Sequence, residues 1–552
     1  MKRASYRVAC GPFAAGLGMM VSIASGGKPL TPPVAPADEP GVNALAAAMF
    51  SMLPAEHQAD MAIGYATREL RDEGLFSEPF EATDERYAKV AHVISRERFD
   101  ALSDAHRRAM IRVADRLEHG EVPMAACFAP GTDPAYVWEM SELLYNVSSR
   151  FQQTSRWNNT ATDGPGSGGQ GNPITITYSY VPDGTPLSGS GATSSLFSWL
   201  NGIYGSPANW QPLFDQVFDR WEELTGVTYV YEINDDGATF GTTTNPGVLG
   251  VRGDVRIGAV PIDGNFGILA FNDFPNNGDM VFDSGDSFFN STGLNSRRLR
   301  NVIAHEHGHG LGMLHVCPQN STKLMEPSAT TAFDGPQLDD ILNGQRHYGD
   351  PLEIGGDVTA LGQVGFPGVS ITEISIDDNS DVDWYTIDIT GPSDVFITAT
   401  PVGETYLQGT QTQACNNGSS FNSRAIHDLS IALFDTDIVT LLAFADNNGL
   451  EGSEILTHQI QDPGTYWVRV SGSGTNNIQL YSFTASVQLL PDQSCNEADL
   501  AEPLGVLDFS DVVAFLGAFA AMDPDADLAA PFGAFDFSDV VAFLGAFGAG
   551  CP

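Results

Sequence analysis

The residues with the clearest chemical capacity are histidines: four of the eleven in the chain lie between residues 305 and 315. Residues four apart on a helix share one face, so His305 and His309 can bind one ion from the same side. Gly312 can adopt a positive φ, which lets the helix end and the chain turn. His315 can then return as a third nitrogen ligand. Three protein ligands leave one position for water, which is the arrangement of a catalytic rather than a structural zinc.

The two residues that follow His305 point in different directions. Glu306 lies about 100° further round a helix, which places its carboxylate beside the open position of the metal, where a general base acts. His307 lies about 200° from His305, so we expect it to serve packing or to face the surface. Neither a chance histidine cluster nor a nickel or copper storage site would require a glutamate at position 306. The pattern therefore favours a catalytic zinc.

Composition excludes several classes of protein. The 552 residues include 26 Lys+Arg and 69 Asp+Glu, a formal net charge of −43. Such a charge repels nucleic acid, so no nucleic-acid partner is predicted. A hydrophobic content of 42% excludes wholesale disorder and supports packed cores. A chain of this length is expected to form three or four domains.

The N-terminus is typical of a secretory signal peptide. Lys2 and Arg3 precede an apolar run, Val8–Ala24, that ends in small residues suited to signal peptidase. A membrane anchor is the alternative, but Gly11 and Pro12 interrupt a run that is already short. No later stretch approaches the roughly 18 apolar residues of a transmembrane helix, so no transmembrane segment is predicted. We expect a secreted protein, extracellular or at the cell surface.

The rest of the chain changes character at several points. Arg-rich and Glu-rich sequence with helical spacing precedes a Gly-rich break, Thr162–Asn172, which we expect to be a boundary accessible to cleavage. Strands and amphipathic helices follow, including helices over 210–225 and 338–348. Short alternating runs separated by turns then predict a β-sandwich. The predicted segments are a signal peptide (1–26), a helical prosegment (27–160), a zinc domain (165–350), a β-sandwich (355–490) and a terminal repeat (495–552).

The terminal repeat is exact over one stretch, because residues 508–519 recur as 536–547. Two copies predict a tandem helical unit rather than a long solenoid. Five cysteines remain once the signal peptide is removed, and Cys495 with Cys551 is the preferred disulfide. Cys317 with Cys415, or either one with Cys127, stays open.

The zinc motif carries a family resemblance. The pattern H-E-x-x-H-x-x-G-x-x-H, followed by Leu324-Met325-Glu326-Pro327, resembles the metzincin metallopeptidases, and most closely the matrixin branch. The resemblance covers about residues 165–350. It implies an α+β catalytic domain with a mixed sheet and an active-site helix, within a multidomain α+β chain that also has a helical prosegment, an all-β sandwich and a small helical repeat. It makes Met325 an apolar floor beneath the metal.

The same resemblance implies a structural calcium ion at Asp263, Asp283 and Asp286, which otherwise are solvated turn residues. Two family features are missing. The positions of a second, structural zinc hold residues that cannot bind it, so we expect one zinc. The usual cysteine latch motif is also absent, and Cys127 is either a thiolate plug for the zinc, a disulfide partner or a buried thiol. The residues in the second zinc positions are Arg256, Gly258, Phe271 and Val281.

Two downstream modules resemble known families as well. Residues 355–490 are similar to the bacterial pre-peptidase C-terminal domain, through Asp381–Tyr385, Leu429–Asp435 and Gly464–Val470. The terminal repeat resembles a dockerin, with aspartates late in each loop but poor calcium ligands early. Its role is either attachment to a cell-surface or docking partner, or a helical hairpin closed by Cys495–Cys551. The aspartates concerned are Asp508, Asp511, Asp536 and Asp539.

These observations predict a secreted zinc endopeptidase that hydrolyses peptide bonds with zinc-activated water and Glu306 as general base. Its partners are protein or peptide substrates. The competing interpretation is a non-catalytic cell-surface adhesion or carbohydrate-binding protein on a metzincin scaffold, with binding through residues 355–490. An intact Glu306 argues against that interpretation. Cleavage specificity does not follow from these residues.

Overall fold

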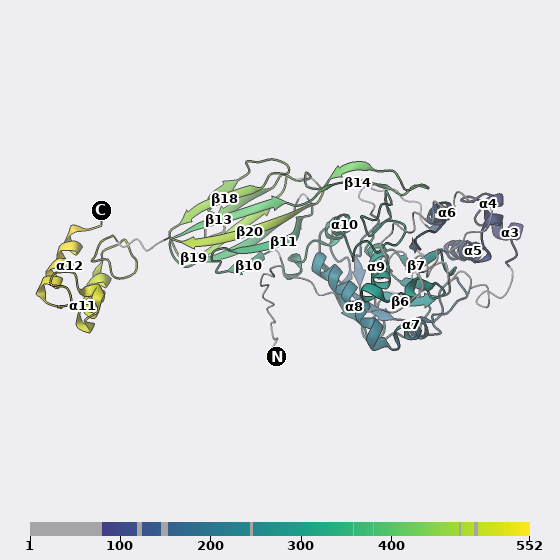
Figure 1. Cartoon of the computed structure of the whole chain (residues 1–552), viewed down its shortest axis with the longest axis horizontal. Coiled ribbons are helices and arrows are strands. Elements are labelled where there is room, and N and C mark those ends of the chain that lie inside the picture. The colour runs from purple at the N-terminus through teal and green to yellow at the C-terminus, as the bar shows by residue number, and fades with distance from the viewer. Residues whose placement is uncertain are drawn as a thin grey trace, which may run out of the picture. The chain divides into compact units, whose positions relative to one another are not determined.

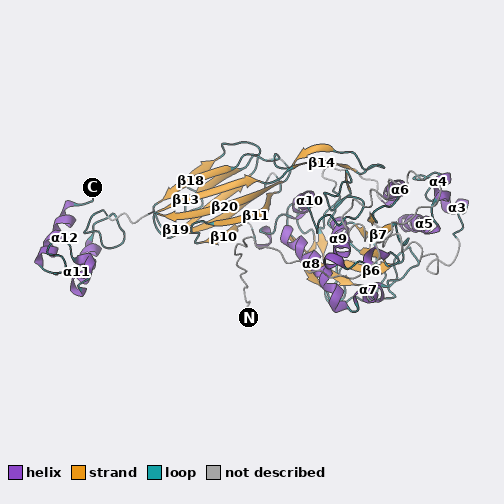
Figure 2. Ribbon diagram, in the orientation of Figure 1, coloured by secondary structure: helices purple, strands orange, loops and turns teal. Residues whose placement is uncertain are grey.

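The computed structural model describes residues 80–118, 124–144, 153–242, 247–356, 358–378, 380–473, 476–490 and 495–551 (Figures 1 and 2). The predicted signal peptide and residues 27–79 of the predicted prosegment lie outside these ranges. No helix in the described part of the chain is both long and apolar enough to cross a membrane.

The described part of the predicted prosegment is mainly helical. Its helices are α3 (Asp84–Ala88), α4 (Arg96–Ala101), α5 (Asp104–Glu118) and α6 (Pro134–Leu144). Thr83 and Ser95 begin the first two of these, because each side chain accepts an amide N–H of the first turn. The expectation of an entirely helical prosegment is wrong at Met124–Phe128, which is strand β1 with all five residues buried.

A six-stranded mixed sheet forms the centre of what we call the mixed-sheet domain (residues 153–350), with strand order β1-β7-β8-β6-β4-β5. Strands β4, β5, β6 and β8 are parallel, whereas β7 is antiparallel to β8 and β1 is antiparallel to β7. β1, from the predicted prosegment, is therefore an edge strand of this sheet. The bounds are β4 (Ile174–Tyr180), β5 (Val227–Tyr231), β6 (Val255–Val260), β7 (Ile268–Asp273) and β8 (Met280–Asp283).

Amphipathic helices cover this sheet. In α8 (Pro207–Leu224) the apolar residues recur every three or four positions, and Trp210, Phe214 and Trp221 are buried in the core. The helix α9 (Gly293–Gly310) packs against α8 and β7, and its first residues after Gly293 have positive φ, so regular helix begins after Ser296. The other helices are α7 (Leu196–Tyr204) and α10 (Leu338–Tyr348), the latter with the predicted bounds.

The compact core extends upstream of the predicted domain start at residue 165. Trp157 is buried in the same cluster, and its indole N–H donates to the Gly310 carbonyl at 2.6 Å. The Gly-rich segment is also packed, since the Gly171 amide donates to the His347 carbonyl and the Arg156 guanidinium donates to the Asn172 carbonyl. The segment also holds the short pair β2 (Asn159–Thr160) and β3 (Gly164–Pro165). It is therefore part of the domain surface rather than an open linker.

The predicted β-sandwich is present. One sheet has the order β10-β12-β19-β16-β17 and the other β11-β20-β13-β18. Alternate residues of β13 are buried, as expected for a strand with one face in the core. The bounds are β10 (Val358–Gly362), β11 (Val369–Ile376), β12 (Val382–Ile389), β13 (Ser393–Pro401), β16 (Ser430–Phe434), β17 (Leu441–Ala445), β18 (Glu454–Ile460), β19 (Gly464–Ser471) and β20 (Gln479–Leu489).

Between β13 and β16 the chain leaves the sandwich and forms what we call the arm (residues 405–422). It contains β14 (Thr405–Thr410) and β15 (Ser419–Asn422). β14 pairs with β9 (Val316–Cys317) of the mixed-sheet domain, directly after His315. A disulfide joins Cys317 to Cys415, which resolves one of the pairings left open.

The terminal repeat is a pair of helices, α11 (Phe509–Ala521) and α12 (Phe537–Ala549). Phe515 and Phe543 stack with ring centroids 4.2 Å apart, and the predicted Cys495–Cys551 disulfide is confirmed. Asp508 caps α11 and Asp536 caps α12. The aspartates that suggested calcium loops thus serve as helix caps.

Candidate active site

The three predicted zinc ligands converge. His305 and His309 lie on α9, Gly312 has a φ of +96°, and the turn brings His315 back to the other two. His305 Nε2 lies 3.1 Å from His309 Nε2 and 3.3 Å from His315 Nε2. Zn–N bonds of about 2.0–2.1 Å in a tetrahedral site hold nitrogens about 3.4 Å apart. The donor set therefore fits one zinc ion.

Each imidazole is oriented by its other nitrogen. Nδ1 of His305 lies 2.7 Å from the Leu324 carbonyl oxygen, and Nδ1 of His309 lies 2.7 Å from that of Met313. Since a carbonyl only accepts, Nδ1 must donate, and Nε2 presents its lone pair to a cation. Burial lowers the pKa of His305 to about 4, so this ring is neutral at physiological pH. Burial also lowers the pKa of His315 to about 3.

Glu306 is buried next to these histidines. Its Oε1 accepts the Cys127 amide N–H at 3.1 Å, and no group in the described residues donates to its Oε2. Burial raises the pKa of this carboxyl well above its ordinary value. A buried acceptor without a partner is costly in a purely structural carboxylate and is typical of a catalytic one.

Strand β1 lies across this site. Cys127 is a buried free thiol, and the ligand atoms of Cys127, His305 and Glu306 lie within 4.8 Å of one another. The Phe128 amide donates to the Pro327 carbonyl at 3.1 Å, and the Ala329 amide donates back to Phe128 at 3.0 Å. β1 is thus held between β7 and the segment after Met325. A disulfide at Cys127, one of the predicted alternatives, is wrong.

Met325 and His307, the other two residues discussed for the motif, both pack against neighbouring side chains or backbone. Met325 is buried, and a Cβ at Gly308 would collide with its sulfur, so glycine lets α9 rest on the turn. Asp340 holds this turn by accepting the amides of Leu324 and Met325. His307 Nε2 lies 2.6 Å from the Tyr229 hydroxyl oxygen, away from the other histidines, as predicted for a packing residue.

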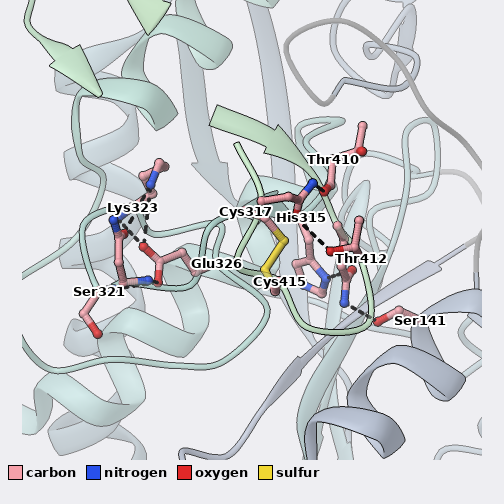
Figure 3. Close-up of a disulfide and its surroundings, with 12 residues drawn as sticks. Ser141, His315, Cys317, Ser321, Lys323, Glu326, Thr410, Thr412 and Cys415 are labelled. Atoms are coloured by element: carbon pink, nitrogen blue, oxygen red, sulfur yellow. Dashed lines mark hydrogen bonds and ion pairs between the residues drawn. A yellow bond between two sulfur atoms is a disulfide. The ribbon is translucent and has the colours of Figure 1, made fainter. Parts of the chain in front are cut away.

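The loop before Met325 is closed by one carboxylate. Glu326 is buried and accepts four successive amides, those of residues 320–323, at 2.7–3.1 Å (Figure 3). These bonds fix the loop that precedes Met325. Sequence reasoning assigned Glu326 no role, because the amides it accepts come from a loop without a regular pattern.

The carboxylates of the three predicted calcium ligands accept hydrogen bonds from nearby groups. Asp283 accepts the amides of Ile262 and Gly264, at 2.9 and 2.7 Å, and Asp263 accepts the Tyr136 hydroxyl at 2.9 Å. Asp286 accepts the Phe288 amide at 2.7 Å. These three residues do not form a group with ligand atoms within 4.8 Å of one another. The carboxylates of Asp263 and Asp283 hold the loop before β7, whereas Asp286 caps the short helical turn after β8.

The positions expected to lack a second zinc are occupied by core residues. Arg256 is fully buried and paired with Asp235 at 2.6 Å. Gly258 leaves no room for a side chain, since a Cβ there would meet the Phe240 ring, and Phe271 and Val281 are buried. Within the described ranges, residues 305, 309 and 315 are the only three histidines brought together.

A second cluster of metal-ligating side chains was not predicted. We call Asp350, Glu353, Asp377, Asp381 and Asp383 the junction carboxylates. They lie between the end of α10 and the start of β12, which contains Asp383, and form two overlapping groups with ligand atoms within 4.8 Å. Asp377 is 3% exposed, and nothing in the described residues donates to its Oδ2. Burial and neighbouring carboxylates raise the pKa of Asp377 to about 9 and that of Glu353 to about 11. Most of these residues line a cavity of about 330 Å³.

Comparison with known proteins agrees with the geometry of the histidine site. Residues 206–349 match the family model of matrixin. This region is matrixin-like. The match spans α8, α9 and α10 and includes the three histidines predicted to bind zinc, and it indicates a zinc metallopeptidase whose substrates are proteins or peptides.

Two solved structures are also similar to parts of the chain. One is the pre-peptidase C-terminal domain of a collagenase from Bacillus anthracis, at 14% identity over 23% of this chain and 94% of that one, with a TM-score of 0.16. The other is PliG of Aeromonas hydrophila, a periplasmic inhibitor of g-type lysozyme, at 11% identity over 24% of this chain and 98% of that one, with a TM-score of 0.16.

Proposed function

We propose that the protein is a secreted zinc endopeptidase, made as a latent precursor. The observation that supports this most strongly is the convergence of three neutral, buried imidazoles beside the Glu306 carboxylate. Zinc held by His305, His309 and His315 supplies a Lewis acid that polarises the scissile carbonyl and acidifies water. Glu306 takes the proton of the attacking water at its free Oε2 and delivers it to the leaving amine.

Strand β1 indicates how a substrate binds. An extended peptide in its place would pair antiparallel with β7 and parallel with the segment at Ser328, as β1 does. In the precursor β1 occupies this position between β7 and Ser328, and the Cys127 amide donates to Glu306. The adjacent thiol supports the interpretation of Cys127 as a plug for the metal. Activation therefore requires removal of the prosegment, with a cut upstream of the packed residues Gln153 and Trp157.

The function is tested by cleavage of a denatured protein after removal of the prosegment, with Glu306→Gln as the matched variant. Wild type should cleave, a zinc chelator should abolish cleavage, and Glu306→Gln should be inactive while it still binds zinc. Equal inactivity of wild type and variant would support the adhesion alternative, which the matrixin match does not favour. Sequencing the N-terminus of exported protein tests the predicted signal peptide.

We also propose a structural calcium ion at the junction carboxylates. Carboxylate oxygens are the donors that calcium prefers, and a carboxylate oxygen of Asp377 lies within 4.8 Å of ones from Glu353 and Asp381. The Oδ2 of Asp377 accepts no hydrogen bond from the described residues. The ion would tie the end of α10 to the sandwich, because Asp350 and Glu353 come from one segment and Asp377 and Asp381 from another. Calcium at Asp263, Asp283 and Asp286 stays a prediction.

Exposed apolar residues support a docking role for the terminal repeat. Phe509 on α11 and Phe537 on α12 are 77% and 78% exposed, and occupy equivalent positions in the two copies. Val513 and Leu516 are likewise exposed, as are their counterparts Val541 and Leu544. Paired apolar faces of this kind suit a partner protein rather than solvent. Loss of cell-surface retention in a Phe509→Ser/Phe537→Ser variant tests the assignment.

A further inference from the structure

The arm of the sandwich is fixed to the mixed-sheet domain at several points. Its strand β14 pairs with β9 through Gly409 with Cys317 and Thr410 with Val316. The Cys317–Cys415 disulfide closes the other side of this contact, and the Gln319 amide donates to the Cys415 carbonyl at 2.8 Å (Figure 3). The backbone directly after His315 is therefore held by the arm.

Additional contacts anchor the arm further from the histidines. Tyr406 donates its hydroxyl to Asp339 at 2.6 Å, and the Gln408 amide donates to the same carboxylate at 3.0 Å. Asp339 lies in the first turn of α10. These bonds cross between two parts of the chain that are far apart in sequence, so the arm cannot shift along the domain without breaking them.

The arm also reaches a zinc ligand. Gln411 Oε1 lies 2.8 Å from His315 Nδ1, across 96 residues of sequence. The other two ligands are oriented by backbone carbonyls of the mixed-sheet domain itself, at Leu324 and Met313. His315 alone among the three has its Nδ1 paired with a side chain of the sandwich in these contacts.

The amide of Gln411 has a defined orientation. Its Nε2 donates to the Ser141 hydroxyl of the prosegment at 3.0 Å, which leaves Oε1 to face His315. Because Oε1 can only accept, Nδ1 of His315 must carry the proton, and Nε2 is left with its lone pair toward the metal position. Gln411 thus selects the tautomer of His315 that binds zinc.

We propose that Gln411 is a positioning residue for the zinc ligand His315, so that the sandwich, through its arm, completes the zinc site. This inference rests on the proposed function, since it presumes that the three histidines bind zinc. Outer partners of this kind typically contribute about 10–100-fold to metal affinity. The sandwich is then a structural component of the metal centre.

The test compares Gln411→Leu with Gln411→Glu in the full chain. Leucine keeps the approximate volume but cannot accept a hydrogen bond, whereas glutamate can. Zinc affinity is measured by competition with a chromophoric chelator, and ligand geometry by the visible spectrum of the cobalt-substituted protein. We expect Gln411→Leu to lose about 10–100-fold in zinc affinity and to alter the cobalt spectrum. Gln411→Glu should keep the zinc affinity and the cobalt spectrum of wild type.

The control is Gln408→Ala, on the same arm but bonded to Asp339 instead of a ligand; it should leave affinity and spectrum unchanged. If Gln411→Leu binds zinc as tightly as wild type with the same cobalt spectrum, the positioning role is overturned. The same follows if Gln411→Glu fails to restore them or Gln408→Ala has an equal effect. Wild type that binds no zinc would instead overturn the proposed function.

Discussion

Calcium binding at the junction carboxylates should be strongly dependent on pH. Burial and repulsion raise the pKa of Asp377 from 3.8 to about 9 and that of Glu353 from 4.5 to about 11. Without a cation, the folded chain therefore retains protons between about pH 4 and 9 that the unfolded chain loses. The stability of the cation-free protein should fall as pH rises through this window, because ionisation is opposed only in the folded state.

Calcium must displace these protons to bind, and this competition sets how steeply the calcium affinity rises with pH. Below the pKa of a carboxyl, each displaced proton raises the affinity about tenfold per pH unit. Displacement of the Asp377 proton alone thus raises the calcium affinity about a hundredfold between pH 6 and pH 8. Displacement of a second proton, from Glu353, makes the dependence of affinity on pH steeper still. At a calcium concentration about 100 times the dissociation constant, the folded state gains about 2.7 kcal/mol.

The assay is isothermal titration calorimetry of calcium into the zinc-loaded full chain at several pH values. Two buffers of different ionisation enthalpy count the protons released. Asp377→Asn should bind more weakly and release about one proton fewer, whereas Asp462→Asn, in an exposed turn of the sandwich, should behave as wild type. Affinity that is independent of pH, or equal in Asp377→Asn and wild type, would refute the calcium site and its protonated carboxyls.

Three further predictions concern the supporting structure. Arg256→Ala leaves the Asp235 carboxylate buried without its cation and should lower the free energy of unfolding in denaturant by about 3–5 kcal/mol. Arg220→Ala, the control, removes an exposed pair with Glu223 and should lower it by at most about 1 kcal/mol. Equal losses in the two variants would contradict the importance of the buried pair. Asp508→Ala and Asp536→Ala each remove an equivalent helix cap and should lower the stability of the repeat by a similar amount, about 1 kcal/mol, in thermal unfolding followed by circular dichroism. Cys127 is fully buried with a raised pKa, so iodoacetamide should label it only after denaturation, and mass spectrometry that finds labelling of the native precursor would show that β1 leaves the site.

Local patterns carried most of what the sequence predicted correctly. The spacing of His305, His309 and His315 is a property of one helix and one turn, and the structure brings all three together. The helix at Leu338–Tyr348 and most sandwich strands follow from hydrophobic period alone. The disulfide Cys495–Cys551 could be predicted because it closes one small module.

The features that were missed depend on contacts between distant segments. Met124–Phe128 is an apolar run without alternation, and it is a strand because β7 offers it an edge. The junction carboxylates combine the end of α10 with the start of the sandwich, so neither segment reveals the cluster by itself. Gln411 lies in a loop with no pattern, and only the arm's pairing with β9 brings it to His315.

The most direct test of the zinc assignment is the metal content of the purified chain, measured by mass spectrometry of the elements in wild type, His309→Ala and Glu306→Gln. We expect one zinc per chain in wild type and in Glu306→Gln, and a large loss of zinc in His309→Ala, because only His309→Ala removes a ligand. Zinc retained in His309→Ala, or two zinc ions in wild type, would contradict it.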